Sequence, residues 1–237
     1  MDLLNLIVGL IMISIGFLVK STPNLIAGYN AMSKEKKKNV DIEGLTTFLR
    51  NGFITIGLSI IIGYYLLKWI GFTMIANSMI LIATLVGVTI MVIKARKFDH
   101  DKTKNSKMAY FILGLVFLFV IGLITYGFIP SKTIYGDNTI KFSGMYGFEI
   151  GIGEIEHVEL SDKLPTITSR SNGFSFGNIK KGFFNLDEFG KNRLLIHSDL
   201  APYLIMTKNS GDKIIINFKD KIETEETYNK IKIMINK

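Results

Sequence analysis

The chain has 237 residues, of which 48% are hydrophobic, with a mean hydropathy of +0.33 and a formal net charge of +8. Four long apolar runs before Pro130 carry most of this hydrophobicity, whereas the residues after Pro130 have the composition of a soluble domain. The chain contains no cysteine, so disulfide frameworks, thiolate nucleophiles, cysteine-ligated zinc and iron–sulfur clusters are excluded. Composition therefore predicts a membrane-embedded half followed by a water-soluble half.

The positive charge belongs to the membrane half. Up to Pro130 there are 13 Lys and Arg against 6 Asp and Glu, and after it there are 15 against 14. An excess of basic residues beside apolar runs is typical of cytoplasmic loops, because Lys and Arg are retained there during membrane insertion. We therefore interpret the basic character as a signal of membrane topology and expect no nucleic acid partner.

The four apolar runs predict membrane-spanning helices at about residues 3–19, 53–70, 74–93 and 108–129. We expect the first to be an uncleaved helix, because Asp2 precedes it and Lys20 follows it, the reverse of the charge order of a signal peptide. In the second run, Lys68 lies among tyrosine and tryptophan residues, as expected for a lysine that reaches the membrane interface. Residues 1–130 thus form the predicted transmembrane domain.

The loops between the runs predict the orientation of the chain. Six basic residues lie between the first two runs and six more between the last two: Lys20, Lys34, Lys36, Lys37, Lys38 and Arg50, then Lys94, Arg96, Lys97, Lys102, Lys104 and Lys107. We therefore expect both loops in the cytoplasm, with the short turn at Gly71 and both termini outside. This scheme places residues 131–237 on the extracytoplasmic face of the cytoplasmic membrane.

The interiors of the runs indicate packing rather than transport. Gly9 and Gly16 share one helical face, where a second helix can approach closely. Apart from the interfacial Lys68, no charged residue or histidine interrupts the four runs. Because ion and proton pathways need such groups at membrane depth, a transporter or channel with its own coupling chemistry is disfavoured.

The first basic loop carries a distinctive series of residues: Gly28-Tyr29-Asn30, Met32-Ser33-Lys34-Glu35 and Asp41. Ser33 and Asp41 are expected helix N-caps, and residues 42–49 are expected to lie along the bilayer surface. On this series, residues 1–97 resemble a family of small three-helix bacterial membrane proteins that has no established function. The resemblance implies a shared scaffold in a bacterial membrane and carries no mechanism.

After Pro130 the apolar residues alternate along the chain. Tyr146, Phe148, Ile150 and Ile152 occupy every second position, as a half-buried strand requires. Similar short runs follow, separated by turns that contain glycine or asparagine: 158–160, 173–177, 182–186, 193–197, 203–207 and 213–218. The last segment opens with glutamates, closes with lysines and has apolar residues on one helical face. We therefore predict about seven strands followed by a C-terminal helix.

This order of elements resembles the bacterial pleckstrin-homology-like (PH-like) domains. The resemblance spans residues 134–234 and is carried by four segments: Arg170-Ser171-Asn172-Gly173-Phe174, Lys181-Gly182-Phe183-Phe184, 214–218 and Thr227-Tyr228. It implies a β-rich PH-like barrel of about seven strands with a C-terminal helix, over residues 131–237. Eukaryotic members often bind inositol phosphates through basic residues between the first two strands. Residues 143–147 contain none, so lipid-phosphate binding is not carried over.

Candidate binding residues gather in the middle of this domain: Arg170, Asn172, Gly173, Phe174, Phe176, Lys180 and Lys181. The cations and a turn at Asn172-Gly173 suit a carboxylate or phosphate, although a solvated rim is the simpler interpretation. Barrels of this type also leave an edge strand open beside the C-terminal helix, where an extended peptide adds main-chain hydrogen bonds. We expect Phe174 and Phe176 to lie beneath such a groove.

No residue set in the sequence predicts catalysis or a metal site. Glu154, Glu156, His157 and Glu159 include the usual metal-ligating types, but alternation along a strand places them on two opposite faces. His197 has a nearby carboxylate but belongs to no catalytic motif, and no phosphate loop or dinucleotide fingerprint occurs. We expect no enzymatic activity, no metal and no cofactor.

The sequence thus predicts a helical membrane anchor with a binding or assembly domain that recognises a protein or peptide. The bilayer is the second expected partner, and a homo-oligomer is an open alternative. The alternative function is a membrane component of a transport or resistance complex, in which the helices contribute to a pore or a partner interface. Copurification with a permease would favour the alternative, and stable binding by the isolated domain would favour the first function.

Overall fold

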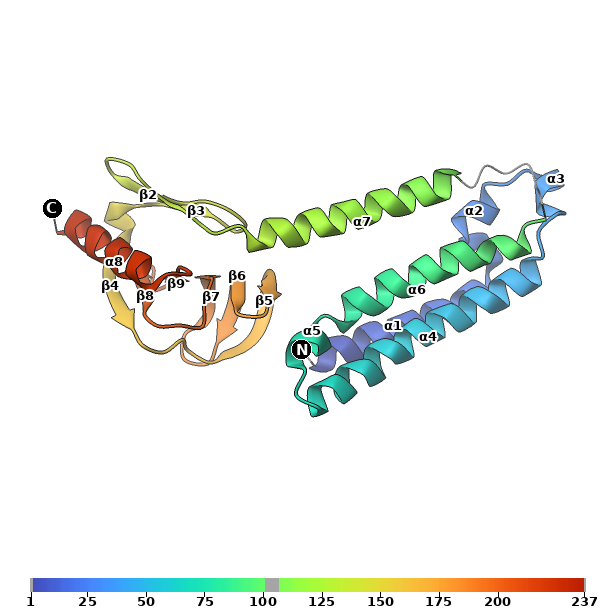
Figure 1. Ribbon diagram of the computed structural model, residues 1–237, viewed down its shortest axis with the longest axis horizontal. Helices are drawn as coiled ribbons and strands as arrows, with labels where there is room; N and C mark the ends of the chain where they lie inside the picture. The colour runs from blue at the N-terminus through green and yellow to red at the C-terminus, as the bar shows by residue number, and fades with distance from the viewer. Residues whose placement is uncertain (1, 101–106, 237) are drawn as a thin grey trace. The chain divides into compact units, whose positions relative to one another are not determined.

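The computed structural model describes residues 2–100 and 107–236 (Figure 1). The chain divides into two compact units, Met1–Val116 and Phe117–Lys237. The first unit contains most of the apolar helices, and the second contains the β-rich region together with the last turns of helix α7 (Lys107–Phe128). The second unit therefore includes the end of an apolar helix as well as the domain that follows it.

Four helices of the described residues are long and apolar enough to span a membrane. They correspond to α1 (Asp2–Ser21), α4 (Ile42–Trp69), α6 (Met79–Ala95), continued by the turn η2 (Arg96–Phe98), and α7. Short helical segments join them: η1 (Pro23–Leu25), α2 (Ala27–Asn30), α3 (Lys34–Lys37) and α5 (Thr73–Asn77). The prediction of four apolar helices is confirmed, and the chain has the helices of a multi-pass membrane protein.

The second and third helices begin at other residues than predicted. Residues 42–49 do not form a separate surface segment but the first turns of α4, which Asp41 caps by accepting a hydrogen bond from the Gly44 N–H at 2.9 Å. Leu45 and Thr46 are buried there, so packing favours continuing the helix. The run at 74–93 is divided at Ser78, whose backbone leaves helical geometry, into α5 and α6.

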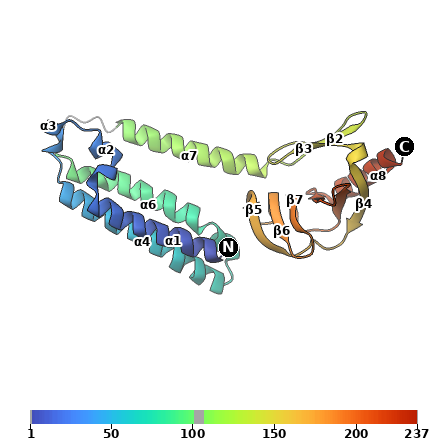
Figure 2. The ribbon, with the colours of Figure 1, turned by 180° about the vertical axis from the view of Figure 1, so that it is seen from behind.

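Glycines bring α1 and α4 together, and Figure 2 shows these two helices side by side. Gly9 and Gly16 are both buried. A methyl group on Gly9 would lie 2.9 Å from the Gly57 carbonyl oxygen, and one on Gly16 would lie 2.9 Å from the Arg50 carbonyl oxygen. The prediction that Gly9 and Gly16 form one packing face is therefore confirmed, because only hydrogen fits between these backbones.

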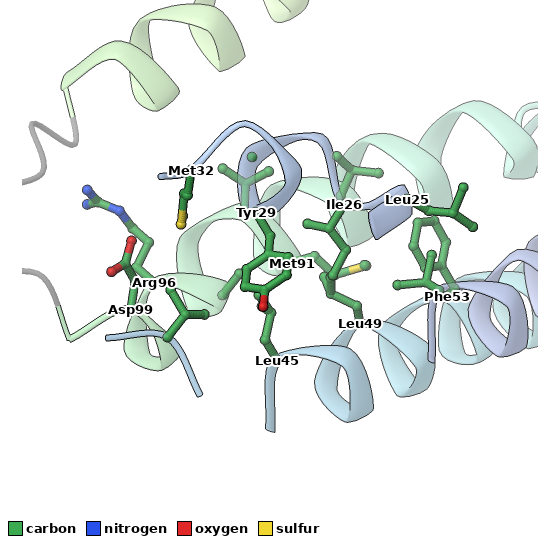
Figure 3. A pocket seen from close by; sticks show the side chains of 16 residues that line it. Leu25, Ile26, Tyr29, Met32, Leu45, Leu49, Phe53, Met91, Arg96 and Asp99 are labelled. Atoms are coloured by element: carbon green, nitrogen blue, oxygen red, sulfur yellow. The ribbon is translucent and has the colours of Figure 1, made fainter. Parts of the chain in front are cut away.

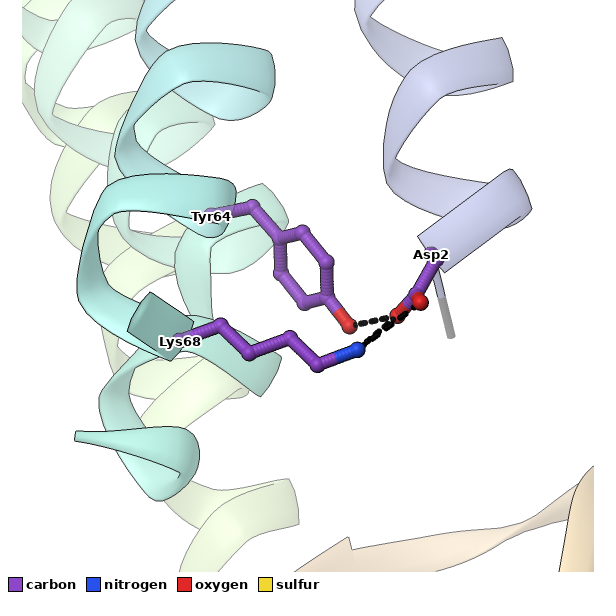
Figure 4. Close-up of polar contacts among 3 residues, drawn as sticks. All are labelled: Asp2, Tyr64 and Lys68. Atoms are coloured by element: carbon purple, nitrogen blue, oxygen red, sulfur yellow. Dashed lines mark hydrogen bonds and ion pairs between the residues drawn. The ribbon is translucent and has the colours of Figure 1, made fainter. Parts of the chain in front are cut away.

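The start of α1 is held to the end of α4 by a polar cluster (Figure 4). The Lys68 ammonium donates to both carboxylate oxygens of Asp2 at 2.8 Å, and the Tyr64 hydroxyl donates to the same carboxylate. The sequence predicted an interfacial position for Lys68 but not its acidic partner, because 66 residues separate the two in the chain.

The second unit contains two sheets within the described residues. A small antiparallel sheet has the order β1 (Thr133–Tyr135), β2 (Thr139–Phe142), β3 (Phe148–Gly151). The turn η3 (Ile152–Glu154) leads into a six-stranded sheet with the order β4 (Ile155–Ser161), β8 (Tyr203–Lys208), β9 (Lys213–Asn217), β7 (Gly190–Ile196), β6 (Ile179–Leu186), β5 (Ile167–Phe176). Its neighbours are antiparallel except β7 and β9, which run parallel.

The C-terminal helix α8 (Lys221–Ile235) packs on the β4–β8–β9 side of the large sheet. Asp220 caps its start by accepting a hydrogen bond from the Ile222 N–H at 3.0 Å. Ile231 is fully buried against a core that includes Leu204, Met206 and Ile216. Burial of one stripe of apolar residues against a sheet explains why this otherwise charged segment folds as a helix here.

The predicted β-rich domain with a C-terminal helix is confirmed, but its details differ. The described residues form nine strands in two sheets and no closed barrel, whereas the sequence predicted about seven strands in a barrel. The six-stranded sheet ends in β4 at one side and β5 at the other, so it keeps two edges. The parallel pairing of β7 with β9 requires the chain to leave the sheet after Ile196, which an alternation pattern does not reveal.

Candidate functional site

The predicted binding residues lie together on the hairpin formed by β5 and β6. Arg170, Asn172, Gly173, Phe174 and Phe176 are on β5, and the two predicted lysines are on β6. Two details of the prediction were wrong. Asn172 and Gly173 form no turn, because they pair with Phe183 and Gly182 inside the sheet. The hairpin also lies at the β5 edge, whereas α8 packs at the β4 side.

Strand β5 is one of the two edge strands of the large sheet, and its pairing with β6 is irregular. Its pairing with β6 shifts between Ile167 and Ser169 and again between Arg170 and Asn172. The second shift leaves Ser171, an exposed residue, without a cross-strand partner. An extra residue of this kind bends a strand and increases its twist. The strand therefore presents a long but bent edge on its side away from β6.

Two aromatic residues of β5 contact the last turn of α7. The rings of Phe174 and Phe176 lie 5.8 Å and 5.3 Å from the ring of Phe128, in edge-on geometry. A methyl group on Gly127 would lie 2.5 Å from the Phe174 ring, so the glycine permits this close contact. Since α7 is a candidate membrane span up to Phe128, the free edge of the sheet lies at the end of a membrane helix.

An apolar cleft of about 440 Å³ opens beside this edge. It is lined by residues of α7, of the β2–β3 turn and of β5: Leu123, Ile124, Tyr126, Met145, Tyr146, Gly173 and Phe174. The Tyr146 hydroxyl donates a hydrogen bond to Asn172 Oδ1 at 2.7 Å. Together these residues form a site with an apolar floor and a polar rim.

Tyr146 occupies a turn rather than the strand that the alternation predicted. Its φ of 60° is in the left-handed region that non-glycine residues rarely adopt, and β3 begins only at Phe148. In this conformation its ring lies over the Gly173–Gly182 pair, since a methyl group on Gly182 would be 3.2 Å from the ring. Such a conformation persists only where surrounding contacts fix it, and strained residues often gather at binding sites.

Lys181 binds the backbone at the end of α7 instead of contributing an exposed cation. Its side chain is fully buried, and its ammonium donates to the Ile129 carbonyl oxygen at 2.6 Å. Burial lowers the Lys181 pKa to about 8. Burial also lowers the pKa of Lys180, opposed by the charge of Asp199, and Arg170 is half-buried. Lys181 thus holds the end of α7 against β6.

His197 binds the backbone at Ser131, just after the end of α7. Its Nε2 accepts a hydrogen bond from the Ser131 N–H at 3.1 Å, while the backbone N–H of His197 donates to Asn217 Oδ1 at 2.9 Å. Burial, followed by the charge of Lys181, lowers the His197 pKa to about 4. His197 is therefore neutral at pH 7, as an acceptor for Ser131 must be. No pattern in the sequence predicted this role, because Ser131 is 66 residues distant.

Glu154, one of the residues considered as metal ligands, has other partners. Glu154 accepts a hydrogen bond from the Gly151 N–H at 3.1 Å and pairs with Lys208 at 3.4 Å, and these contacts lower its pKa. His157 is exposed on the neighbouring strand β4. No group of three potential ligands converges anywhere in the described part of the chain.

A second concave site, which the sequence did not predict, lies in the first unit (Figure 3). It is a cavity of about 490 Å³ between α4, α6 and the first loop. Gly28, Tyr29 and Met32 of the distinctive loop series line it, so that series has a structural role. All of the lining residues lie between Val19 and Asp99.

Residues 6–99 match the family model described as a domain of unknown function, DUF3784. The cavity thus lies wholly within the DUF3784 region, whose match supports the resemblance of the N-terminal half to an uncharacterised membrane-protein family. The match ends before α7 and the β-rich unit begin. Comparisons with curated proteins and with solved structures found no match.

Proposed function

We propose that the second unit is a recognition module at the membrane surface, whose free edge strand β5 binds an extended segment of a protein partner. The observation that carries the proposal is the position of this edge, beside an apolar cleft at the end of the membrane helix α7. An edge strand offers unpaired backbone donors and acceptors, which an added strand can satisfy.

The surroundings of β5 indicate the kind of partner. In an added strand alternate side chains point to one face, so every second residue of a bound segment can enter the cleft beside Tyr146 and Phe174. The cleft also contains Leu123 and Ile124 of the membrane span. A partner segment that meets these residues must itself lie close to the bilayer. We therefore propose a membrane protein as the partner, bound through the extended segment next to one of its own helices.

The proposal assigns binding and assembly, with no catalysis and no cofactor, to the chain. It places the second unit on the extracytoplasmic side, because the basic loops of the first unit are expected in the cytoplasm. Reporter fusions test this orientation. Fusions after Lys38 and Lys97 are expected to behave as cytoplasmic, and a fusion at the C-terminus as external. A cytoplasmic C-terminal reporter would contradict the orientation but not the binding site.

A photoreactive residue at Ser171 tests the binding site in intact cells. Ser171 is exposed and lacks a cross-strand partner, so replacing it leaves the β5–β6 pairing in place. We expect one discrete protein adduct. Identifying the cross-linked protein shows whether the partner is a permease or a component of another assembly. The matched control is the same residue at Ser210, which is exposed in the β8–β9 turn.

The adduct must also depend on the site. Replacing Asn172 by alanine removes the acceptor of the Tyr146 hydroxyl and is expected to weaken the adduct severalfold. Adducts of equal yield from Ser171 and Ser210, labelling of lipid alone, or an adduct unaffected by Asn172→Ala and Arg170→Ala would each overturn the assignment of this edge.

A further inference from the structure

The cavity of the DUF3784 region has the shape of a site for an amphiphile. Its volume of about 490 Å³ falls in the range of roughly 300–1,000 Å³ that is typical of ligand sites. Figure 3 shows Arg96 and Asp99 at one end, Leu25 and Phe53 at the other, and Tyr29 between them. An occupant with a long apolar body and a single polar end would match this arrangement.

The apolar walls belong to candidate membrane spans. Leu49 and Phe53 lie on the span Ile42–Trp69, and Val88 and Met91 lie on the span Met79–Phe98. Acyl chains of the bilayer surround such helices, so an acyl chain reaches these walls without crossing water. A water-soluble ligand would have to give up its hydration to enter the same space. The position of the cavity therefore favours a lipid as its occupant.

Arg96 and Asp99 are the charged residues that line the polar end, and Lys37 lies beside Tyr29. The Arg96 guanidinium lies 4.9 Å from the centre of the Tyr110 ring and donates to the Tyr110 hydroxyl at 3.1 Å, which orients it. The Lys37 ammonium lies 5.0 Å from the centre of the Tyr29 ring, and Asp99 supplies one carboxylate. Guanidinium groups bind phosphate through two parallel hydrogen bonds, so Arg96 suits the phosphate of a lipid headgroup.

We propose that the cavity holds one acyl chain of an anionic phospholipid from the surrounding bilayer, with the lipid phosphate at Arg96. Basic pockets between membrane helices bind anionic headgroups by this combination of charge and apolar depth. The site gives the loop series at Gly28, Tyr29 and Met32 a function, because these residues line the cavity that holds the acyl chain. The proposal is independent of the peptide site on β5.

Native mass spectrometry of the full chain tests the proposal. The chain is released from nanodiscs that contain equal amounts of phosphatidylglycerol and phosphatidylcholine. We expect one phosphatidylglycerol molecule to be retained per chain, in preference to phosphatidylcholine by about fivefold to tenfold, as one well-placed cation provides. Arg96→Gln is expected to abolish this preference. The matched control is Lys94→Gln, which removes an exposed charge from the same candidate span without touching the cavity.

A second variant tests the apolar part of the site. Leu49→Trp adds volume inside the cavity and is expected to remove the retained phosphatidylglycerol; if this variant does not fold, the response to Arg96→Gln decides alone. Four results would overturn the proposal: equal retention of the two lipids, retention unchanged by Arg96→Gln, a free fatty acid in place of a phospholipid, or a second copy of the chain as the species retained.

Discussion

Acid should weaken the second unit through His197, because burial keeps this side chain neutral in the folded chain. In the unfolded chain a histidine takes up a proton below its ordinary pKa of 6.5, whereas His197 in the folded chain stays neutral down to about pH 4. Between these values the unfolded state binds more protons, so folding stability falls as the pH falls from 6.5 to 4. The loss amounts to about 3 kcal/mol when complete.

Hydrogen exchange in the full chain, which measures local stability, tests the prediction. Protection of amides in β7, β8 and β9 is compared between the wild type and His197→Gln at the same pH, so that intrinsic exchange rates cancel. Glutamine can still accept the hydrogen bond from the Ser131 N–H but cannot be protonated in this range. We expect the stability of the wild type relative to the variant to fall by about 3 kcal/mol from pH 7 to pH 4.

The control is His157→Gln, which replaces an exposed histidine on β4. Because His157→Gln leaves His197 in place, this variant should lose the same stability as the wild type between pH 7 and pH 4. A difference between wild type and His197→Gln that stays constant with pH would refute the argument. It would show that His197 is protonated without cost in the folded chain, and that the hydrogen bond from the Ser131 N–H does not require the neutral ring.

Three further predictions concern the two units. The folded pKa of Lys181 is about 8 against an ordinary 10.5, so the wild type should gain stability in thermal unfolding as the pH rises from 8 to 10.5. Lys181→Met should remove this gain. A gain that persists in the variant would contradict the burial of Lys181 as a cation. Gly182→Ala should destabilise the second unit by at least about 1–3 kcal/mol in the same assay, because φ is +119° and a backbone oxygen lies 2.5 Å from the new methyl group. At Gly190 the new methyl group meets open space, so Gly190→Ala should destabilise the unit less. Cysteines at Asp2 and Lys68, in a chain without native cysteine, should be joined within one chain by a short bismaleimide; no cross-link in folded protein would argue against the contact between α1 and α4.

The sequence by itself determined the class of structure and the local elements. Apolar runs long enough to span a bilayer predicted four helices, because backbone polar groups in hydrocarbon must bond within the segment. The seven-residue spacing of Gly9 and Gly16 predicted a helix-packing face, which depends only on helical geometry. Glutamates before lysines in the last segment predicted a C-terminal helix. Each of these inferences depends on residues close together in the chain.

Interactions between distant segments needed the tertiary structure. Alternation identified strands but could not order them, since β8 and β9 insert between β4 and β7 through connections that carry no periodic signal. The sequence grouped the candidate binding residues in one part of the domain, but only the pairing of Asn172 and Gly173 with β6 showed a strand where a turn was predicted. The bonds from Lys181 to Ile129 and from His197 to Ser131 join segments 52 and 66 residues apart. The cavity likewise exists only where α4, α6 and the first loop meet, because a concave surface is a property of packed elements and not of any one segment.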